Sequence, residues 1–361
     1  THCYERRLLQ SLSYVFRDIF CMVVLGFIAN NYIHLIPNQF IRFAAWTGYV
    51  WCQGLFGTGI WVLAHECGHQ AFSDYGSVND FVGWVLHSYL LVPYFSWKFS
   101  HGKHHKATGH LTRDMVFVPK TKEEFLQNRG VKDLDDLLGD SPMYSLLTLI
   151  FQQTFGWISY LVANVSGQKY PGVSFLKLNH FNPNSLIFDK KDYWYILLSD
   201  LGILLQFFNL YVWYQSFGGF NLLVNYVLPY FLVNHWLVFI TYLQHSDPQM
   251  PHYEASQWTF ARGAAATIDR EFGFVGKHIF HDIIETHVLH HYVSRIPFYN
   301  AREASEAIKK VMGIHYQHSD ENMWVSLWKS ARWCQFVDGN NGVLMYRNTN
   351  GFGVDPKKQT H

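Results

Sequence analysis

Residues 19–65 of the chain read IFCMVVLGFIANNYIHLIPNQFIRFAAWTGYVWCQGLFGTGIWVLAH and contain a single Lys, Arg, Asp or Glu, which is Arg42. Arg42 divides the stretch into two uncharged runs, 19–41 and 43–65, each of 23 residues. About 20 apolar residues are enough for a helix to cross the hydrocarbon core of a bilayer. The stretch therefore predicts a hairpin of two transmembrane helices that ends at His65.

A second stretch of the same kind lies further along the chain. Between Asp192 and Asp247 the only charged residue is Asp200, and the pair Gly218-Gly219 divides the stretch in two. Each half is long enough to span, which predicts helices over 193–217 and 219–244. We expect an all-α integral membrane protein with four transmembrane helices in two hairpins. The rest of the single domain, 66–192 and 245–361, would form a helical cap.

The composition agrees with a membrane protein. Charged residues make up 15% of the 361 residues, against roughly 25% in soluble proteins. Aromatic residues reach 18%, and Trp and Tyr favour membrane interfaces. The net charge of +1 gives no reason to expect a nucleic-acid partner. The five cysteines are scattered and never spaced as CxxC, so we expect packed, reduced thiols.

Three histidine clusters follow or lie between the predicted spans: HECGH at 65–69, HGKHH at 101–105 and HVLHH at 287–291. Their spacings of three and four residues place the imidazoles of a cluster on one helical face. Eight imidazoles exceed the coordination of one ion but suit two first-row metals, and imidazole alone does not select the metal. His245 follows the last predicted span at the same membrane boundary as the first cluster, and we expect it to be a ninth ligand.

Other residues are assigned by their position relative to these clusters. Glu66, His87, Thr241 and His281 are predicted to orient the ligands or line a pocket, because metal-bound histidines are held by hydrogen bonds from outside. The remaining isolated histidines are expected to be structural or exposed: His34, His180, His235, His252, His278, His315 and His318.

Two other functions fit part of the pattern. HECGH matches HExxH, in which two histidines bind zinc and the glutamate is the general base of a hydrolase. A zinc hydrolase needs only one further protein ligand, so at least five clustered histidines would have no role. A metal transporter would carry its ligands within the spans, whereas these clusters lie at or beyond the ends of the spans.

The cap is predicted to be cytoplasmic, because cytoplasmic segments carry more Lys and Arg. Residues 66–140 contain eight such residues, whereas the hairpin tips offer only Arg42. For all clusters to reach one centre, the chain must cross the membrane an even number of times between any two of them. The uncharged runs 81–97 and 141–168 are therefore expected to lie in the interface or to enter the membrane and return on the same side. Residues 120–140 are expected to be a solvated excursion. Arg113, Asp114 and Lys120 could meet lipid headgroups, although solvated surface is the simpler expectation.

Four segments carry a resemblance to a known family: HECGHQAFS (65–73), LHSYLLVPYFSWKFSHGKHHKATGHLTRDMVFVPK (86–120), ITYLQHSDPQMPHY (240–253) and ETHVLHHYVSRIPFYNAREA (285–304). With three histidine boxes in this order around two apolar hairpins, the chain resembles the membrane fatty-acid desaturases. Within that family it is most similar to acyl-lipid delta-12 and omega-3 desaturases, especially those of fungi. The likeness covers nearly the whole chain.

The resemblance implies a di-iron centre, O2 as co-substrate, and electrons from NADH through cytochrome b5 and its reductase. It also implies an endoplasmic-reticulum membrane protein whose active site faces the cytoplasm. In animal acyl-CoA desaturases, the residue four positions before the histidine that follows the last span is an asparagine, which holds a metal-bound water. This chain has Thr241 at that position, so the resemblance does not extend to that water. The implied metal ligands are His65, His69, His101, His104, His105, His245, His287, His290 and His291.

The reaction expected from the resemblance is insertion of a cis double bond at delta-12 of a phospholipid-linked oleoyl chain, giving linoleoyl. Alternatives within the family are the omega-3 (delta-15) reaction, both reactions in one enzyme, hydroxylation, or the formation of conjugated double bonds. An apolar tunnel between the spans is expected to hold the chain, because selectivity requires one pair of carbons beside the metals.

Overall fold

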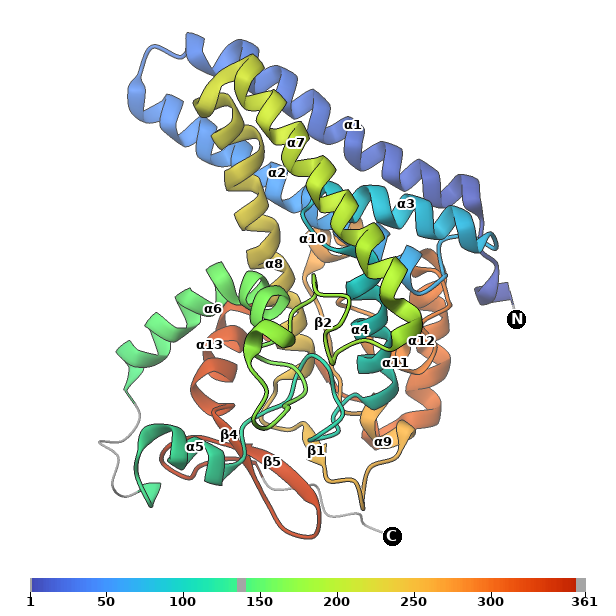
Figure 1. Cartoon of the computed structure of the whole chain (residues 1–361), viewed down its shortest axis with the longest axis vertical. Helices are drawn as coiled ribbons and strands as arrows, with labels where there is room; N and C mark the ends of the chain where they lie inside the picture. Colours follow the sequence, from blue (N-terminus) through green and yellow to red (C-terminus); the bar gives the residue numbers. More distant parts are fainter. Residues whose placement is uncertain (1, 135–140, 355–361) are drawn as a thin grey trace.

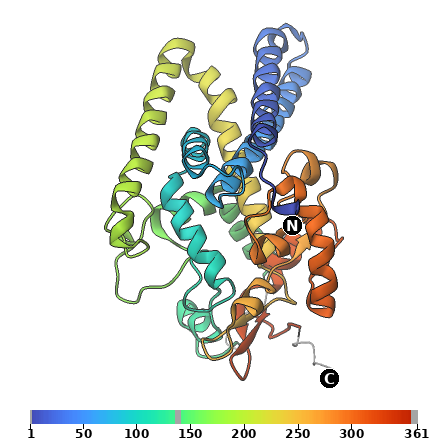
Figure 2. The same ribbon diagram turned by 90° about the vertical axis from the view of Figure 1, so that its right-hand side faces the viewer.

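The computed structural model describes residues 2–134 and 141–354 and is mostly helical. Two long helical hairpins rise from the same side of a cap made of shorter helices (Figure 1). Turned by 90°, α7 lies on the opposite side of the molecule from α1 and α2, with α3 between them (Figure 2). The helices of the described residues are α1 (Leu8–Tyr32), α2 (Gln39–Gly68), α3 (Gly76–Tyr89), α4 (Tyr94–Ala107), α5 (Lys122–Arg129), α6 (Pro142–Ala163), α7 (Tyr193–Leu222), α8 (Leu228–His245), α9 (Phe260–Ala264), α10 (Gly273–His278), α11 (His287–Tyr292), α12 (Phe298–Met312) and α13 (Met323–Trp333).

The first hairpin exists, but its predicted boundaries are wrong. Helix α1 begins at Leu8 and the chain turns at 33–38, so the first helix is displaced from the predicted 19–41. Arg17 and Asp18, the charged residues that directly precede the predicted span, lie inside α1. Asp18 is fully buried and accepts hydrogen bonds from Arg17 and His281, with Oδ2 at 2.8 Å from His281 Nε2. A carboxylate with such partners can stay within a helix.

The second hairpin turns where the glycine pair predicted. Gly218 has φ +80° and ψ 169°, a backbone conformation that breaks the helix and favours glycine. The chain continues through a π-helical segment, Leu223–Val227, into α8. The tips of both hairpins are joined by side-chain amides: Asn30 Nδ2 donates to Asn225 Oδ1 at 2.9 Å, and Asn221 Nδ2 donates to Asn30 Oδ1 at 3.0 Å.

Helix α2 is the central helix, because α1, α3 and α8 all pack against it. A Cβ at Gly54 or Gly57 would lie 2.5 or 2.7 Å from Leu232 or Val233 of α8. The two helices therefore approach as closely as small residues allow, which is typical of helix pairs in membranes. Residues from Tyr49 to Cys67 of α2 are mostly buried.

Three segments of the described residues are long and apolar enough to cross a membrane: Leu8–Leu35, Pro142–Ala163 and Lys190–His245, the last containing both α7 and α8. Helix α2, with 30 residues, is long enough to cross a membrane but is not one of these three segments. Helix α6 meets the criterion, yet it runs obliquely to the hairpins at the lower half of α8 (Figure 1). Four spans and an interfacial α6 therefore remain predictions.

The expectation of an all-helical chain is wrong in one detail. Strands β1 (Pro251–Tyr253), β5 (Val343–Arg347) and β4 (Phe336–Asp338) form an antiparallel sheet, and β2 (Asp269–Arg270) pairs in parallel with β3 (His318–Ser319). The predicted excursion at 120–140 contains α5, whose Phe125 is buried against Phe336 at 4.8 Å between ring centroids. Residues 135–140 of that excursion lie outside the described residues.

Candidate metal centre

Four elements bring the three histidine clusters and His245 to one place. His65 lies in the last turn of α2, and His69 caps that helix. The second cluster is in α4, His245 is the last residue of α8, and the third cluster is in α11. Because each cluster occupies about one helical turn, its imidazoles project toward the neighbouring elements rather than around the helix.

The first group consists of five imidazoles that come from all three histidine clusters. One ring nitrogen of each lies within 4.8 Å of the others. His101 Nε2 is 3.1 Å from both His65 Nε2 and His105 Nε2. The members of this group are His65, His69, His101, His105 and His290.

The second group lies directly beside the first. Ring nitrogens of His104, His245 and His291 also lie within 4.8 Å of one another. His287 joins them, since its Nε2 is 3.0 Å from His245 Nε2. The stacked rings of His105 and His291, with centroids 4.1 Å apart, connect the two groups. The structure thus brings all nine predicted ligands together as a set of five and a set of four.

The spacing of these nitrogens fits metal ions. A metal–imidazole bond of about 2.1 Å places two ligands at right angles about 3 Å apart. Six ring nitrogens of the nine histidines are buried and have no hydrogen-bond partner, and His69 Nε2, His290 Nε2 and His291 Nε2 are among them. Buried polar atoms without a partner are costly, and a bound cation would satisfy them. That the nine histidines bind metal remains a prediction.

Burial keeps these imidazoles in the form that binds metals. Desolvation, followed by the neighbouring histidines, lowers the pKa of the ring well below its ordinary value of 6.5, and only a neutral imidazole nitrogen can coordinate. This lowering of the pKa applies to His69, His101, His105, His245, His287, His290 and His291.

Two residues that orient the histidines were not identified from the sequence. Asp114 was expected on solvated surface, but it is buried and its Oδ1 lies 2.6 Å from His104 Nδ1. Thr108 Oγ1 lies 3.0 Å from His291 Nδ1. Burial alone would raise the pKa of Asp114, but His104 and the Val116 N–H offset burial, so the pKa lies below its ordinary value. Such partners fix the tautomer and orientation of a ligating ring.

The four residues predicted to surround the ligands differ in their surroundings. Glu66 is buried near His65, with 3.7 Å between Oε1 and Nδ1, and accepts the Phe298 N–H at 3.1 Å. His87 is buried against Trp61, whose carbonyl oxygen lies 3.3 Å from Nε2. His281 contacts Asp18 instead of the histidine groups. Thr241 donates to the Leu237 carbonyl at 2.7 Å and lines the adjoining cavity.

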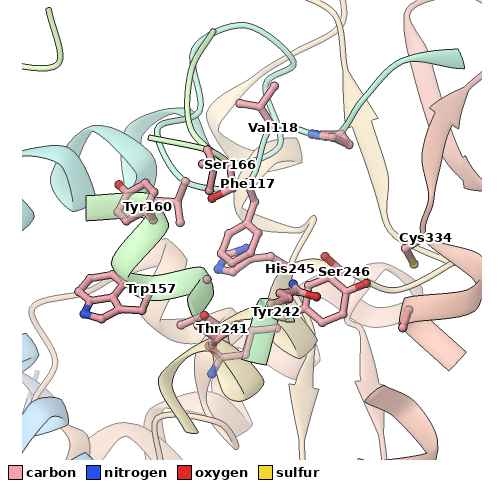
Figure 3. A pocket seen from close by; sticks show the side chains of 18 of the residues that line it. Phe117, Val118, Trp157, Tyr160, Ser166, Thr241, Tyr242, His245, Ser246 and Cys334 are labelled. Carbon is pink, nitrogen blue, oxygen red and sulfur yellow. The ribbon is translucent and has the colours of Figure 1, made fainter. Parts of the chain in front are cut away.

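A cavity of about 530 Å³ opens onto both histidine groups. Its walls include His65 and His101 of the first group and His104, His245 and His287 of the second. Figure 3 shows Trp157 and Tyr160 of α6, Thr241 and His245 of α8, and Phe117 around this space. Trp61 and Trp97 line it as well, so its inner part offers apolar walls to an acyl chain beside the histidines.

The model of the fatty acid desaturase family matches residues 43–321, which contain all nine histidines and most of the residues that line the cavity. The chain belongs to the fatty acid desaturase family. It is therefore an oxidoreductase that acts on fatty acyl chains. The zinc hydrolase and the transporter, which the histidine spacing alone left open, are set aside.

Curated relatives match nearly the whole of this desaturase. An oleate hydroxylase of Claviceps purpurea is 48% identical, with 98% of this chain and 80% of the relative covered. A delta(12) fatty acid desaturase of Mortierella alpina is 42% identical and a delta(12)-fatty-acid desaturase of Arabidopsis thaliana is 43% identical; each comparison covers 96% of this chain and 88% of the relative.

Proposed function

We propose that the enzyme inserts a cis double bond at delta-12 of an oleoyl chain carried by a membrane lipid, giving linoleoyl. The observation that carries this proposal is the pair of histidine groups facing one largely apolar cavity. Nine imidazoles can hold two first-row metals, and the cavity can hold an extended acyl chain beside them. The names of the delta(12) relatives support the position of the double bond.

The nine histidines would hold two irons, and the irons would supply activated dioxygen, the oxidant that an unactivated C–H bond requires. One O2, two hydrogens from the chain, two further electrons and two protons give two waters. The protein's own side chains would position the substrate, because Trp61, Trp97, Trp157 and Ile240 all line the cavity. Misplacing the reacting carbons by about 1 Å costs on the order of 100-fold in rate.

The reaction consumes two electrons beyond those that the acyl chain supplies. We propose cytochrome b5, reduced by NADH through its reductase, as the donor. The matching location is the endoplasmic-reticulum membrane, with four spans and the cap facing the cytoplasm. The Lys and Arg residues of the cap support this orientation.

A second outcome, hydroxylation of the oleoyl chain, is favoured by one observation: the relative with 48% identity is named an oleate hydroxylase. Desaturation removes hydrogen from two adjacent carbons, whereas hydroxylation inserts oxygen at one. Both reactions need the same part of the acyl chain beside the histidines. The position of the second C–H bond therefore decides between the two products. The omega-3 reaction, alone or together with delta-12, requires a linoleoyl chain in the same cavity.

The test is expression of the full chain in a yeast that makes no polyunsaturated fatty acids. We expect 18:2 with the new double bond at delta-12. A hydroxylated 18:1 product would favour the second outcome, and 18:3 from supplied 18:2 the omega-3 reaction. The variant His104→Ala should form no product, whereas His315→Ala, at an exposed position away from the histidine groups, should behave as wild type. Activity in His104→Ala would contradict the assignment of the site.

A further inference from the structure

The cavity has an outer end with a different character from its inner end. Lys120, Asn128 and Arg129 line the cavity and are exposed, whereas Trp61 and His65 line it and are buried. The cavity therefore runs from solvent-accessible cationic and amide side chains to the histidine groups. An acyl chain in the inner part would leave its carboxyl end, and whatever carries it, at the outer part.

Arg129 is held at this outer end by aromatic rings. Its guanidinium carbon lies 4.2 Å from the centroid of Phe125 and 5.3 Å from that of Tyr144. Phe125 is buried against Phe336 of β4, so the stacking platform is fixed to the cap. Stacking uses the faces of the guanidinium and leaves its N–H edges free for a planar or tetrahedral oxyanion.

Neither Arg129 nor Lys120 forms an ion pair within the described part of the chain. The backbone of Lys120 is fixed, because its carbonyl accepts the Val337 N–H at 2.8 Å. The nearby carboxylate Glu124 is already paired with Lys169 at 2.5 Å and accepts the Thr121 N–H at 2.9 Å. Two exposed cations at the cavity mouth thus remain available for an external anion.

The wall between the two ends is intermediate in polarity. Helix α6 turns Ser145, Thr148 and Gln152 toward the cavity, followed by Gly156 and Trp157. On the outside, the same helix exposes large apolar side chains: Met143, Leu146, Leu147, Ile150 and Phe151. An apolar outer face beside a cationic mouth is the arrangement expected at the level of lipid headgroups.

We propose that Arg129 and Lys120 bind a phosphate group of the acyl carrier, with the ester end of the chain beside Ser145, Thr148 and Gln152. This inference rests on the proposed function, because it assumes an acyl chain in the cavity. The phosphate can belong to a phospholipid headgroup or to an acyl-coenzyme A. In both cases a charge-assisted, bidentate contact from Arg129 fixes how far the chain enters.

The test measures binding rather than turnover. Purified, iron-loaded full-length enzyme is titrated with oleoyl-lysophosphatidylcholine, oleoyl-coenzyme A and monooleoylglycerol, which share the acyl chain but differ in phosphate. We expect wild type to bind one of the phosphate-bearing ligands at least about 10-fold more tightly than monooleoylglycerol, or about 1.4 kcal/mol. The phosphate-bearing ligand that binds more tightly identifies the source of the phosphate.

The variants Arg129→Gln and Lys120→Gln should weaken binding of that ligand by about 10-fold and leave monooleoylglycerol unchanged. Arg129→Lys should be intermediate, because it keeps the charge but loses the bidentate geometry. The matched control is Arg42→Gln, at a half-buried arginine beside the first hairpin tip, which does not line the cavity and should change nothing. Equal binding of all three ligands by wild type, or an equal loss for all three in Arg129→Gln, would overturn the phosphate site. Neither result would affect the yeast products that test the proposed function.

Discussion

His104 and Asp114 form a buried pair in which Nδ1 of the imidazole lies 2.6 Å from Oδ1 of the carboxylate. The carboxylate is itself held by backbone N–H groups, with Val116 N at 2.9 Å from Oδ1 and Gly109 N at 3.1 Å from Oδ2. The loop after α4 therefore fixes the ring of His104 and leaves Nε2 to face His245 and His291. A metal ligand oriented in this way binds more tightly than a free one.

Asp114→Asn should weaken metal binding, because the amide has no negative charge to support His104 as a ligand. We expect an affinity loss of about 10- to 100-fold, measured as iron retained during dialysis against a graded series of chelator concentrations. Asp320→Asn is the control, since Asp320 is exposed and pairs only with His318. Iron retention equal to wild type in Asp114→Asn would refute this role.

Gly156→Leu should narrow the cavity between α6 and α8. A Cβ at this position would lie 3.6 Å from both Gln152 and Val238, an ordinary contact, so Gly156→Ala should keep activity. The larger Leu side chain would extend into the space for the acyl chain and lower conversion of oleoyl by about 10-fold or more. Gly48→Leu, where nothing lies within 4 Å, is the control. The measurement is the amount of product that each variant forms in yeast. Full activity of Gly156→Leu would show that the acyl chain does not lie in this part of the cavity.

Topology can be tested with single cysteines introduced at exposed positions. Phe81→Cys and Lys169→Cys should gain labelling from the cytoplasm if α3 and α6 do not cross the membrane, whereas Leu35→Cys at the first hairpin tip should be labelled only from the lumen. All three positions are exposed. Luminal labelling at Lys169 would make α6 a fifth span and would contradict the cytoplasmic cap.

Acid should destabilise the cap through buried neutral histidines outside the metal site. Burial lowers the pKa of His180 to about 4 from the ordinary 6.5. Between these values the unfolded chain binds a proton that the folded chain excludes, so stability falls as the pH decreases, by about 1.4 kcal/mol per pH unit. His180→Gln should therefore lose less stability than wild type when the pH falls from about 7.5 to about 5.5, measured by thermal unfolding. An equal decrease in both proteins would contradict the buried neutral state.

The features that depend on periodicity and spacing could be predicted from the sequence. The helix breaks at Gly218, in the turn of the second hairpin, as expected, because a positive φ at a helix break favours glycine. The imidazoles of each histidine cluster lie on one side of their helix, because residues three and four positions apart share a helical face. These are local relationships, and one chain is enough to reveal them.

The features that were missed depend on partners far apart in sequence. The charge of Asp18 lies outside the predicted span, but the residue is buried inside the protein, where His281, distant along the chain, donates a hydrogen bond to its carboxylate. Asp114 looks like any polar loop residue until the loop folds back onto His104. The small sheet does carry a local signal: GNNG at 339–342 lies between β4 and β5, and Asn341 and Gly342 both have positive φ, as hairpin turns require.

The central claim is that the nine histidines form one dinuclear iron site. Its most direct test is the metal content of purified full-length enzyme, determined by mass spectrometry of the metals relative to protein concentration. We predict about two irons per chain, with iron lost in the variant His69→Ala and retained in His315→Ala. One zinc per chain and no iron would contradict the claim.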